Sequence, residues 1–207
     1  MDQDQDAELA RVLLSGAQGA FERFVDAYHS RLFQYAYLMC GQREDAEEVS
    51  QDTLLNVFAT IGQLRDPSRL KAWVFRIAKN ACLMMRRKST FAPSRVLSLE
   101  ELMPVRLDGK QKIEIADWSM LPDADVFRTE LREVLNRAIA ELPEMYRAVL
   151  LLRDLEGLST AETAQILDEN EAVIKQRLHR ARLAVRASID QYLRRRSYDG
   201  HGQRTNS

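Results

Sequence analysis

Two groups of basic side chains in this chain of 207 residues have the spacing of exposed helix faces. The first group contains Arg69, Arg76 and Arg87 together with the polar Asn80, spaced seven, four and seven residues apart. Lys79 and Arg86 lie beside them in the sequence. Such intervals bring side chains to one face of an α-helix. A row of guanidinium and ammonium groups can neutralise the phosphates of a nucleic-acid backbone, so the spacing favours phosphate binding.

The second group follows Glu171, on a helix with a matching apolar stripe. Ile174, Leu178, Ala181 and Val185 recur at helical spacing and are expected to be buried. The exposed positions of this helix are mostly basic and comprise Lys175, Gln176, Arg177, His179, Arg180, Arg182 and Arg186. The sequence therefore predicts a second cationic helix.

A short helix and a turn precede this second basic helix. Ser159 and Glu162 have the spacing of a capping box, which predicts a helix over 160–167, and residues 168–170 fit the turn. A short helix, a tight turn and a basic helix form a helix-turn-helix, whose second helix fits the major groove of DNA. A solvated helix hairpin would show the same local pattern.

Net charge argues at first against a nucleic-acid partner, because 30 basic and 31 acidic residues give a formal charge of −1. The distribution is uneven. Residues 1–64 carry −7, 65–88 carry +7, 89–125 carry −3, 126–174 carry −5 and 175–207 carry +7. Each half thus has an acidic block before a basic one, which favours DNA binding combined with docking onto a basic partner.

Apolar stripes place these blocks on helices. Helical spacing predicts a helix or helix pair over 20–40 and a helix over 127–139. A helix over 46–61 buries Ala46, Val49, Thr53, Leu54, Val57, Phe58 and Ile61. Its polar face holds Asp45, Glu48, Asp52 and Asn56. The first basic group shares its helix with a stripe of Leu70, Trp73, Val74, Ile77, Ala81 and Met84.

The predicted fold class is all-α, because 8 glycines and 5 prolines are too few for a turn-rich β fold. Helical periodicity lapses in the middle of the chain, so we expect two small helical domains joined by a long flexible linker. The expected divisions are an N-terminal acidic segment at 1–19, a domain at 20–88, the linker at 89–125, a helix-turn-helix domain at 126–193 and a disordered basic tail at 194–207.

Several classes of function are disfavoured. No apolar run approaches the length of a membrane span and the N-terminus is acidic, so we expect a cytoplasmic protein without membrane insertion. The soft metal-ligand candidates His29, His179, Cys40 and Cys82 are scattered, which argues against a metal, a cofactor or a catalytic site. A helical enzyme or metal protein is the least favoured class. An autonomous helix-turn-helix repressor or activator is the other alternative, and it would bind its operator unaided.

Three long motifs follow one another along the chain: EDAEEVSQDTL at 44–54, AWVFRIAKN at 72–80, and LLLRDLEGLS at 150–159 followed by KQRLHRAR at 175–182. Together they resemble the extracytoplasmic-function sigma factors, the small two-domain sigma-70 relatives of bacteria. The resemblance implies an alternative sigma factor, not an enzyme, that directs core RNA polymerase to promoter DNA. It also implies docking on the polymerase clamp and flap and control by an anti-sigma factor.

Residue roles follow from the resemblance. The clamp-binding positions correspond to Asp45, Glu48, Gln51, Asp52 and Asn56. The segment 62–70 corresponds to the loop that captures a base flipped out of the minus-10 element. The implied minus-10 residues are Arg65, Ser68, Arg69, Trp73, Arg76, Lys79, Asn80 and Arg86. Trp73 is expected in the core, with a wedge at the melted junction as the alternative.

The implied minus-35 residues are Ser159, Thr160, Glu171, Lys175, Gln176, Arg177, Arg180 and Arg182. Ser159 and Thr160 would hold a phosphate at a helix N-terminus. Arg177 could read a guanine edge, and Glu171 could accept from a cytosine amino group. Where relatives commonly have Gly-Thr-Val-Lys-Ser-Arg, this chain reads AVIKQR at 172–177, so the promoter sequence is left open.

Overall fold

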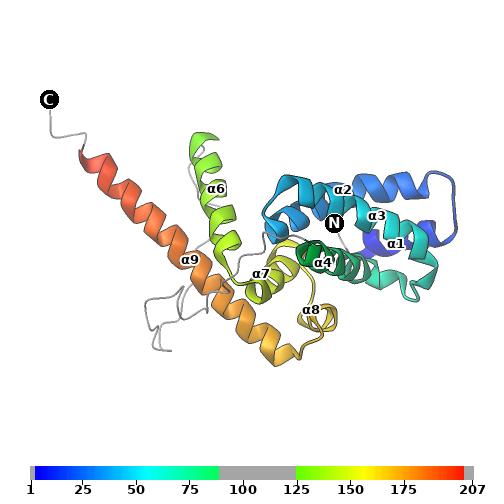
Figure 1. Ribbon diagram of the computed structural model, residues 1–207. Helices are drawn as coiled ribbons and strands as arrows, with labels where there is room; N and C mark the ends of the chain where they lie inside the picture. The colour runs from blue at the N-terminus through cyan, green and yellow to red at the C-terminus, as the bar shows by residue number, and fades with distance from the viewer. Residues whose placement is uncertain (1–2, 89–124, 203–207) are drawn as a thin grey trace.

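The described residues of the computed structural model, 3–88 and 125–202, are helical and contain no strand (Figure 1). The N-terminal unit contains α1 (Gln3–Leu14), α2 (Ala20–Cys40), α3 (Arg43–Thr60) and α4 (Leu70–Lys88), with 3₁₀ turns η1 (Ile61–Gln63) and η2 (Pro67–Arg69). The C-terminal unit contains α6 (Asp125–Glu141), α7 (Glu144–Leu150), the π-helical turn η4 (Leu151–Leu155), α8 (Thr160–Leu167) and α9 (Glu171–Gly202). The all-α prediction is confirmed, and the predicted linker lies outside the described residues except for Asp125.

Helix α2 supplies the largest buried side chains of the N-terminal unit. Phe24, Tyr28, Leu32 and Tyr35 are buried on the face that packs against α3 and α4. The helix ends at Gly41, whose φ of 83° is a left-handed conformation that favours glycine and whose N–H donates to the carbonyl of Tyr37. The sequence predicted both the stripe and this end.

Two predicted core residues are instead exposed. Phe58, in the last turn of α3, is 63% exposed, and its ring meets that of Phe21 edge-on at 4.8 Å between centroids. Met84 is 61% exposed. The buried residues of α4 are the predicted Leu70 and Val74 together with Phe75, Ala78, Cys82 and Met85, and α4 packs against α2, α3 and α8. Trp73 is half-buried rather than enclosed.

Helix α1 was not predicted within the acidic segment 1–19. It buries Ala7, Ala10 and Leu13 and packs against η2. Its apolar residues do recur at helical spacing, but two of the three are alanines, which give a weak hydrophobic signal.

The C-terminal unit follows the predicted pattern more closely. Ile174, Leu178, Ala181 and Val185 are all buried along α9. The tail differs from the prediction, because α9 continues beyond residue 194 to Gly202 and only 203–207 lie outside the described residues. Arginine is a good helix former, and extending an existing helix avoids the cost of nucleating a new one.

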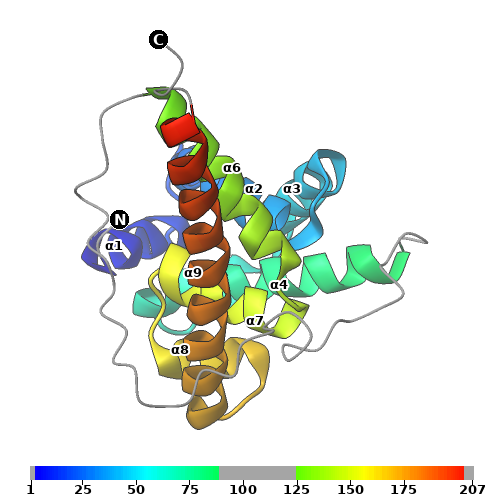
Figure 2. The same ribbon diagram turned by 90° about the vertical axis from the view of Figure 1, so that its left-hand side faces the viewer.

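The two units pack against each other. Helix α8 lies against α4, and α6 and α7 lie against α2 (Figures 1 and 2). Arg31 of α2 donates from Nε and an Nη atom to Glu156 Oε2 at 3.1 and 2.6 Å, and the Glu156 side chain is 3% exposed. Arg147 of α7 donates to the carbonyl oxygens of Met39 at 3.0 Å and Leu38 at 3.4 Å, close to the end of α2. Buried polar contacts thus join the units as well as apolar packing.

Candidate polymerase and nucleic-acid interfaces

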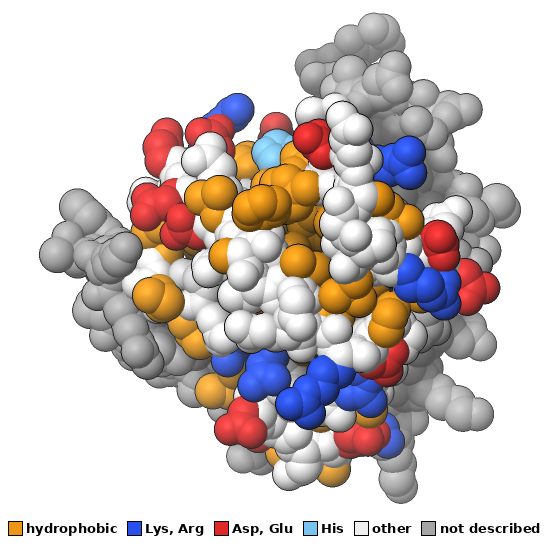
Figure 3. All heavy atoms as spheres, turned by 90° about the vertical axis from the view of Figure 1, so that its right-hand side faces the viewer, with side chains coloured by type: hydrophobic (Ala, Val, Ile, Leu, Met, Phe, Trp, Pro, Cys, Tyr) orange, Lys and Arg blue, Asp and Glu red, His pale blue; other side chains and the backbone are white. Residues whose placement is uncertain are grey.

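The exposed face of α3 combines acidic and apolar side chains. Glu48, Gln51, Asp52 and Asn56 are exposed, and Asp45 is half-buried. Leu55 of the same helix is 64% exposed and adjoins the exposed Phe58 in sequence. Figure 3 shows the side of the molecule on which the N-terminal unit lies. Hydrophobic side chains gather there beside acidic ones, apart from a band of Lys and Arg. Such a face suits a basic partner with an apolar centre.

The sequence predicted the polar members of this face but assigned Phe58 to the core and gave Leu55 no role. Leu55 follows the buried Leu54, and adjacent positions of a helix point about 100° apart, so the position of Leu55 off the apolar stripe was the available signal.

The loop between α3 and α4 is held by its own side chains. Asp66 Oδ1 accepts hydrogen bonds from the backbone N–H of Ser68 at 3.0 Å and from its hydroxyl at 2.6 Å. These bonds lower the pKa of Asp66, the hydroxyl contributing most. Arg65, Ser68 and Arg69 are exposed around this turn, and Arg69 lies 3.6 Å from Asp66 and donates to Gln165 Oε1 at 3.2 Å.

Helix α4 presents part of the predicted basic row to solvent. Arg76 and Asn80 are exposed and Lys79 is half-buried. Arg86 pairs with Glu144 of α7, so a residue of the C-terminal unit neutralises it. The side chain of Arg87 lies outside the described residues.

The helix-turn-helix has well-formed ends. Ser159 Oγ accepts from the N–H of Glu162 at 3.2 Å, and Glu162 Oε2 accepts from the N–H of Ser159 at 2.7 Å, which confirms the predicted capping box. Asp168 ends α8 in a left-handed conformation with φ of 55°, and Asn170 Oδ1 accepts from the N–H of Val173 at 2.9 Å to open α9. Thr160 is half-buried.

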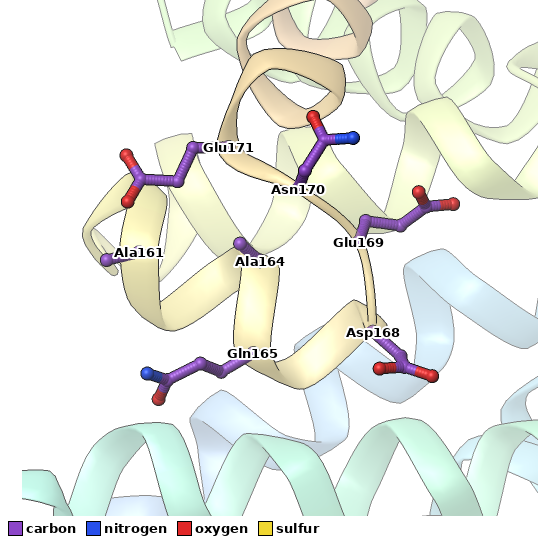
Figure 4. Close-up of a pocket in the computed structure, with 7 residues that line it drawn as sticks. All are labelled: Ala161, Ala164, Gln165, Asp168, Glu169, Asn170 and Glu171. Carbon is purple, nitrogen blue, oxygen red and sulfur yellow. The ribbon is translucent and has the colours of Figure 1, made fainter.

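A hollow of about 630 Å³ lies at the turn between α8 and α9 (Figure 4). Its lining includes Asp168, Glu169 and Glu171, while Gln165 projects from α8 toward α4. Three carboxylates disfavour an anion there, so we expect nucleic acid to approach the basic side of α9 instead.

The predicted minus-35 residues fall into two groups on α9. Lys175, Gln176 and Glu171 are exposed. Arg177 donates to Glu169 Oε1 at 2.8 Å, and Arg182 donates to both carboxylate oxygens of Asp154 at 2.9 and 2.6 Å. The hydrogen bond to Asp154 raises the pKa of Arg182. Arg180 is half-buried. The sequence gave no sign of these ion pairs, because Asp154 lies 28 residues away from Arg182.

A cleft of about 630 Å³ lies where the two units meet, and a few of the predicted DNA-binding residues line it. Asp66, Ser68 and Arg69 line it from the N-terminal unit, and Ser159 and Gln165 line it from the C-terminal unit. Nearby, burial raises the pKa of Glu156, while the Arg31 guanidinium acts in the opposite direction. Of the predicted DNA-binding residues, this cleft therefore brings together Ser68 and Arg69 of the minus-10 set and Ser159 of the minus-35 set.

Within the described ranges, no three His, Cys, Asp or Glu side chains are grouped as metal ligands would be. The same residues contain no helix that is long and apolar enough to cross a bilayer.

Two family models match these units. Residues 24–91 match Sigma-70 region 2, and residues 132–185 match Sigma-70 region 4. The chain is 30% identical over 174 residues to the ECF RNA polymerase sigma factor SigW of Bacillus subtilis, an alignment that covers 84% of this chain and 91% of that protein.

Two solved structures share the fold. CnrH, in complex with the cytosolic domain of CnrY, is 25% identical with a TM-score of 0.61, covering 92% of this chain and 99% of CnrH. The sigma factor RpoE of Bartonella quintana, in complex with the anti-sigma factor NepR, is 22% identical with a TM-score of 0.60, covering 83% of this chain and 98% of RpoE.

The helix-turn-helix and the matched regions define a transcription initiation protein of the sigma-70 class. The chain belongs to the extracytoplasmic-function sigma factors, which direct RNA polymerase to promoters. Region 2 and region 4 below mean the units that contain α1–α4 and α6–α9.

Proposed function

We propose that this sigma factor divides its work among three surfaces: α3 docks on the polymerase clamp, the 62–70 loop with α4 reads the minus-10 element, and α8 with α9 reads the minus-35 element. The observation that carries the proposal is the separation of an acidic and apolar face on α3 from basic residues in both regions. The functional domains are then 20–88 and 126–193, linked by 89–125.

Docking on the clamp uses the polar and the apolar part of α3. Asp45, Glu48, Gln51, Asp52 and Asn56 face basic groups of the polymerase, and the exposed Leu55 and Phe58 supply apolar area at the centre. Neighbouring exposed apolar side chains rimmed by polar ones are typical of a protein interface. Region 4 docks separately, on the flap.

Promoter melting uses the loop and α4. Arg65, Ser68 and Arg69 surround the base that leaves the minus-10 element, and Arg76, Lys79, Asn80 and Arg86 hold the strand, with Trp73 beside them. Unstacking a base costs a few kcal/mol, so the strand must be held by charge while the loop encloses the base.

Recognition of the minus-35 element uses the ends of α8 and α9. Ser159 and Thr160 hold a phosphate at the N-terminus of α8. Lys175, Gln176 and Arg180 face the major groove, where Arg177 reads a guanine or Glu171 a cytosine. Arg182 contacts the backbone after leaving Asp154, and Arg177 must likewise leave Glu169.

We infer that the two regions separate when both elements are bound, because Arg69 and Arg86 of the minus-10 set are engaged by Gln165 and Glu144 of region 4 in this structure. A protein that engages DNA after joining the polymerase gains from this arrangement. We further propose control by an anti-sigma factor, a partner that the fold relative RpoE has in its solved complex. The chain acts in the cytoplasm, without cofactor or catalytic activity of its own.

Charge reversal on α3 tests the clamp surface. Asp52→Lys is expected to weaken binding to core RNA polymerase about tenfold or more, because it places like charge against a basic surface. Binding is measured by fluorescence anisotropy of the labelled sigma factor. Asp4→Lys, at an exposed position of α1, is the matched control and should bind normally. Equal binding by both variants and the wild type would place the clamp surface elsewhere.

A further inference from the structure

Helix α1 supports the loop to which we assign base capture. It packs against η2 and also contacts η1, α2 and α4. It lies before residue 24, where the match to Sigma-70 region 2 begins. The three buried apolar residues of α1 explain its attachment to the core, but one buried residue of this helix is charged.

That residue is Asp6, whose side chain is 2% exposed. The Tyr28 hydroxyl donates to Asp6 Oδ1 at 2.7 Å, and Asp6 Oδ2 lies 3.4 Å from Lys71 Nζ. Burial and the Asp6 carboxylate raise the pKa of Tyr28, so the phenol stays protonated and remains a donor. Asp6 therefore connects α1 to both α2 and α4.

Lys71 lies where the loop becomes a helix. It is the second residue of α4, and η2 ends two residues before it at Arg69. The hydrogen bond from the Ser68 N–H to Asp66 holds the middle of the loop, and Leu64, near the start of the loop, is buried. The ion pair with Asp6 fixes the remaining end, at Lys71.

We propose that Asp6 is a positioning residue for base capture, acting through Lys71 and Tyr28 to hold the loop in its base-binding shape. The proposal rests on the assignment of 62–70 as the capture loop. A loop that is ordered before the base enters loses less conformational entropy on binding, so affinity for the flipped base is higher. Asp6 itself does not touch the base.

Single-stranded oligonucleotides with the minus-10 sequence test this role, using the promoter selected by wild-type holoenzyme. Each oligonucleotide lacks one base, and binding to holoenzyme is measured by anisotropy. Loss of the captured base is expected to weaken wild-type binding about tenfold. The Asp6→Asn variant should bind the intact strand more weakly than the wild type does, by a similar factor. Removing the captured base should then weaken binding by this variant less than about twofold further.

Glu8→Gln is the matched control, because it removes a carboxylate from the exposed side of the same helix, where Glu8 pairs with Arg11 at 2.7 Å. It should behave as the wild type. If thermal melting shows that Asp6→Asn does not fold, Lys71→Met removes the same ion pair from α4 and takes its place in the test.

Two results would overturn the positioning role: an Asp6 variant that binds like the wild type, or one that loses the same additional factor as the wild type when the base is removed. The assignment of 62–70 as the capture loop would be overturned by a different result, in which wild-type holoenzyme loses no affinity at any of the abasic positions.

Discussion

Cys40 and Cys82 face each other between α2 and α4 but differ in environment. Cys82 is buried, and Cys40 is half-buried near the end of α2. The hydrogen bond from the Cys82 thiol lowers the pKa of Cys40, and the same contact together with burial raises the pKa of Cys82. The thiolate that forms first is therefore the accessible one.

This difference predicts selective alkylation. Iodoacetamide added to the native protein should modify Cys40 at least about tenfold faster than Cys82, with a midpoint in pH below that of an ordinary thiol, because only the thiolate reacts. Peptide mass spectrometry measures the two rates. Equal modification of both cysteines in folded protein would contradict the geometry between α2 and α4.

Residues that bind DNA in our proposal are partly engaged within the protein. Arg69, Arg86, Arg177 and Arg182 each have a partner in the chain, and two of these partners, Gln165 and Glu144, belong to the opposite region. Sequence spacing identified the basic residues because helix periodicity determines which face they share. Their partners were not predictable, because tertiary packing brings them together across 58 and 96 residues of sequence.

At the scale of elements, the helix-turn-helix is the part that sequence predicts best. Its capping box, its turn and the buried stripe of α9 are local features, and each was found where expected. Predictions failed where a helix contacts several neighbours, as for Met84 on α4, or carries a weak apolar pattern, as for α1. Local chemistry determines helix ends, whereas packing determines which face is buried.

The capping box gives a test at this scale. Ser159→Ala removes the acceptor of the Glu162 N–H and should lower the free energy of unfolding by about 1 kcal/mol. Urea denaturation measures the loss. Ser188→Ala on α9 removes a hydroxyl that donates to the Ala184 carbonyl and caps no helix end, so a smaller change is expected. If Ser159→Ala unfolds with the same free energy as the wild type, the cap does not stabilise α8.

At the scale of the molecule, regions 2 and 4 are held together by a buried ion pair. The Arg31 guanidinium lies 4.8 Å from the centroid of the Tyr28 ring and 5.6 Å from that of Phe75, and it pairs with Glu156 across the boundary between the regions. The sequence did not predict this contact, because Arg31 and Glu156 are 125 residues apart. Such a pair fixes one arrangement, since either charge left alone in that position is costly.

Charge reversal at this pair should open the molecule. Glu156→Arg places a cation against Arg31 and Lys71, so the radius of gyration of the free protein, measured by X-ray scattering, is expected to rise. Asp154→Arg is the matched control, because Asp154 belongs to the same π-helical turn but pairs with Arg182 within region 4. If both variants stay as compact as the wild type, the ion pair does not hold the regions together.

The central claim is that regions 2 and 4 together direct RNA polymerase to two promoter elements. Selection of promoters from random DNA by core polymerase reconstituted with this chain tests it most directly. The account predicts enrichment of two short elements at a fixed spacing, with transcription starting downstream, and no such enrichment by the free chain. Tight, sequence-specific binding by the free chain, with no association with core polymerase, would contradict it.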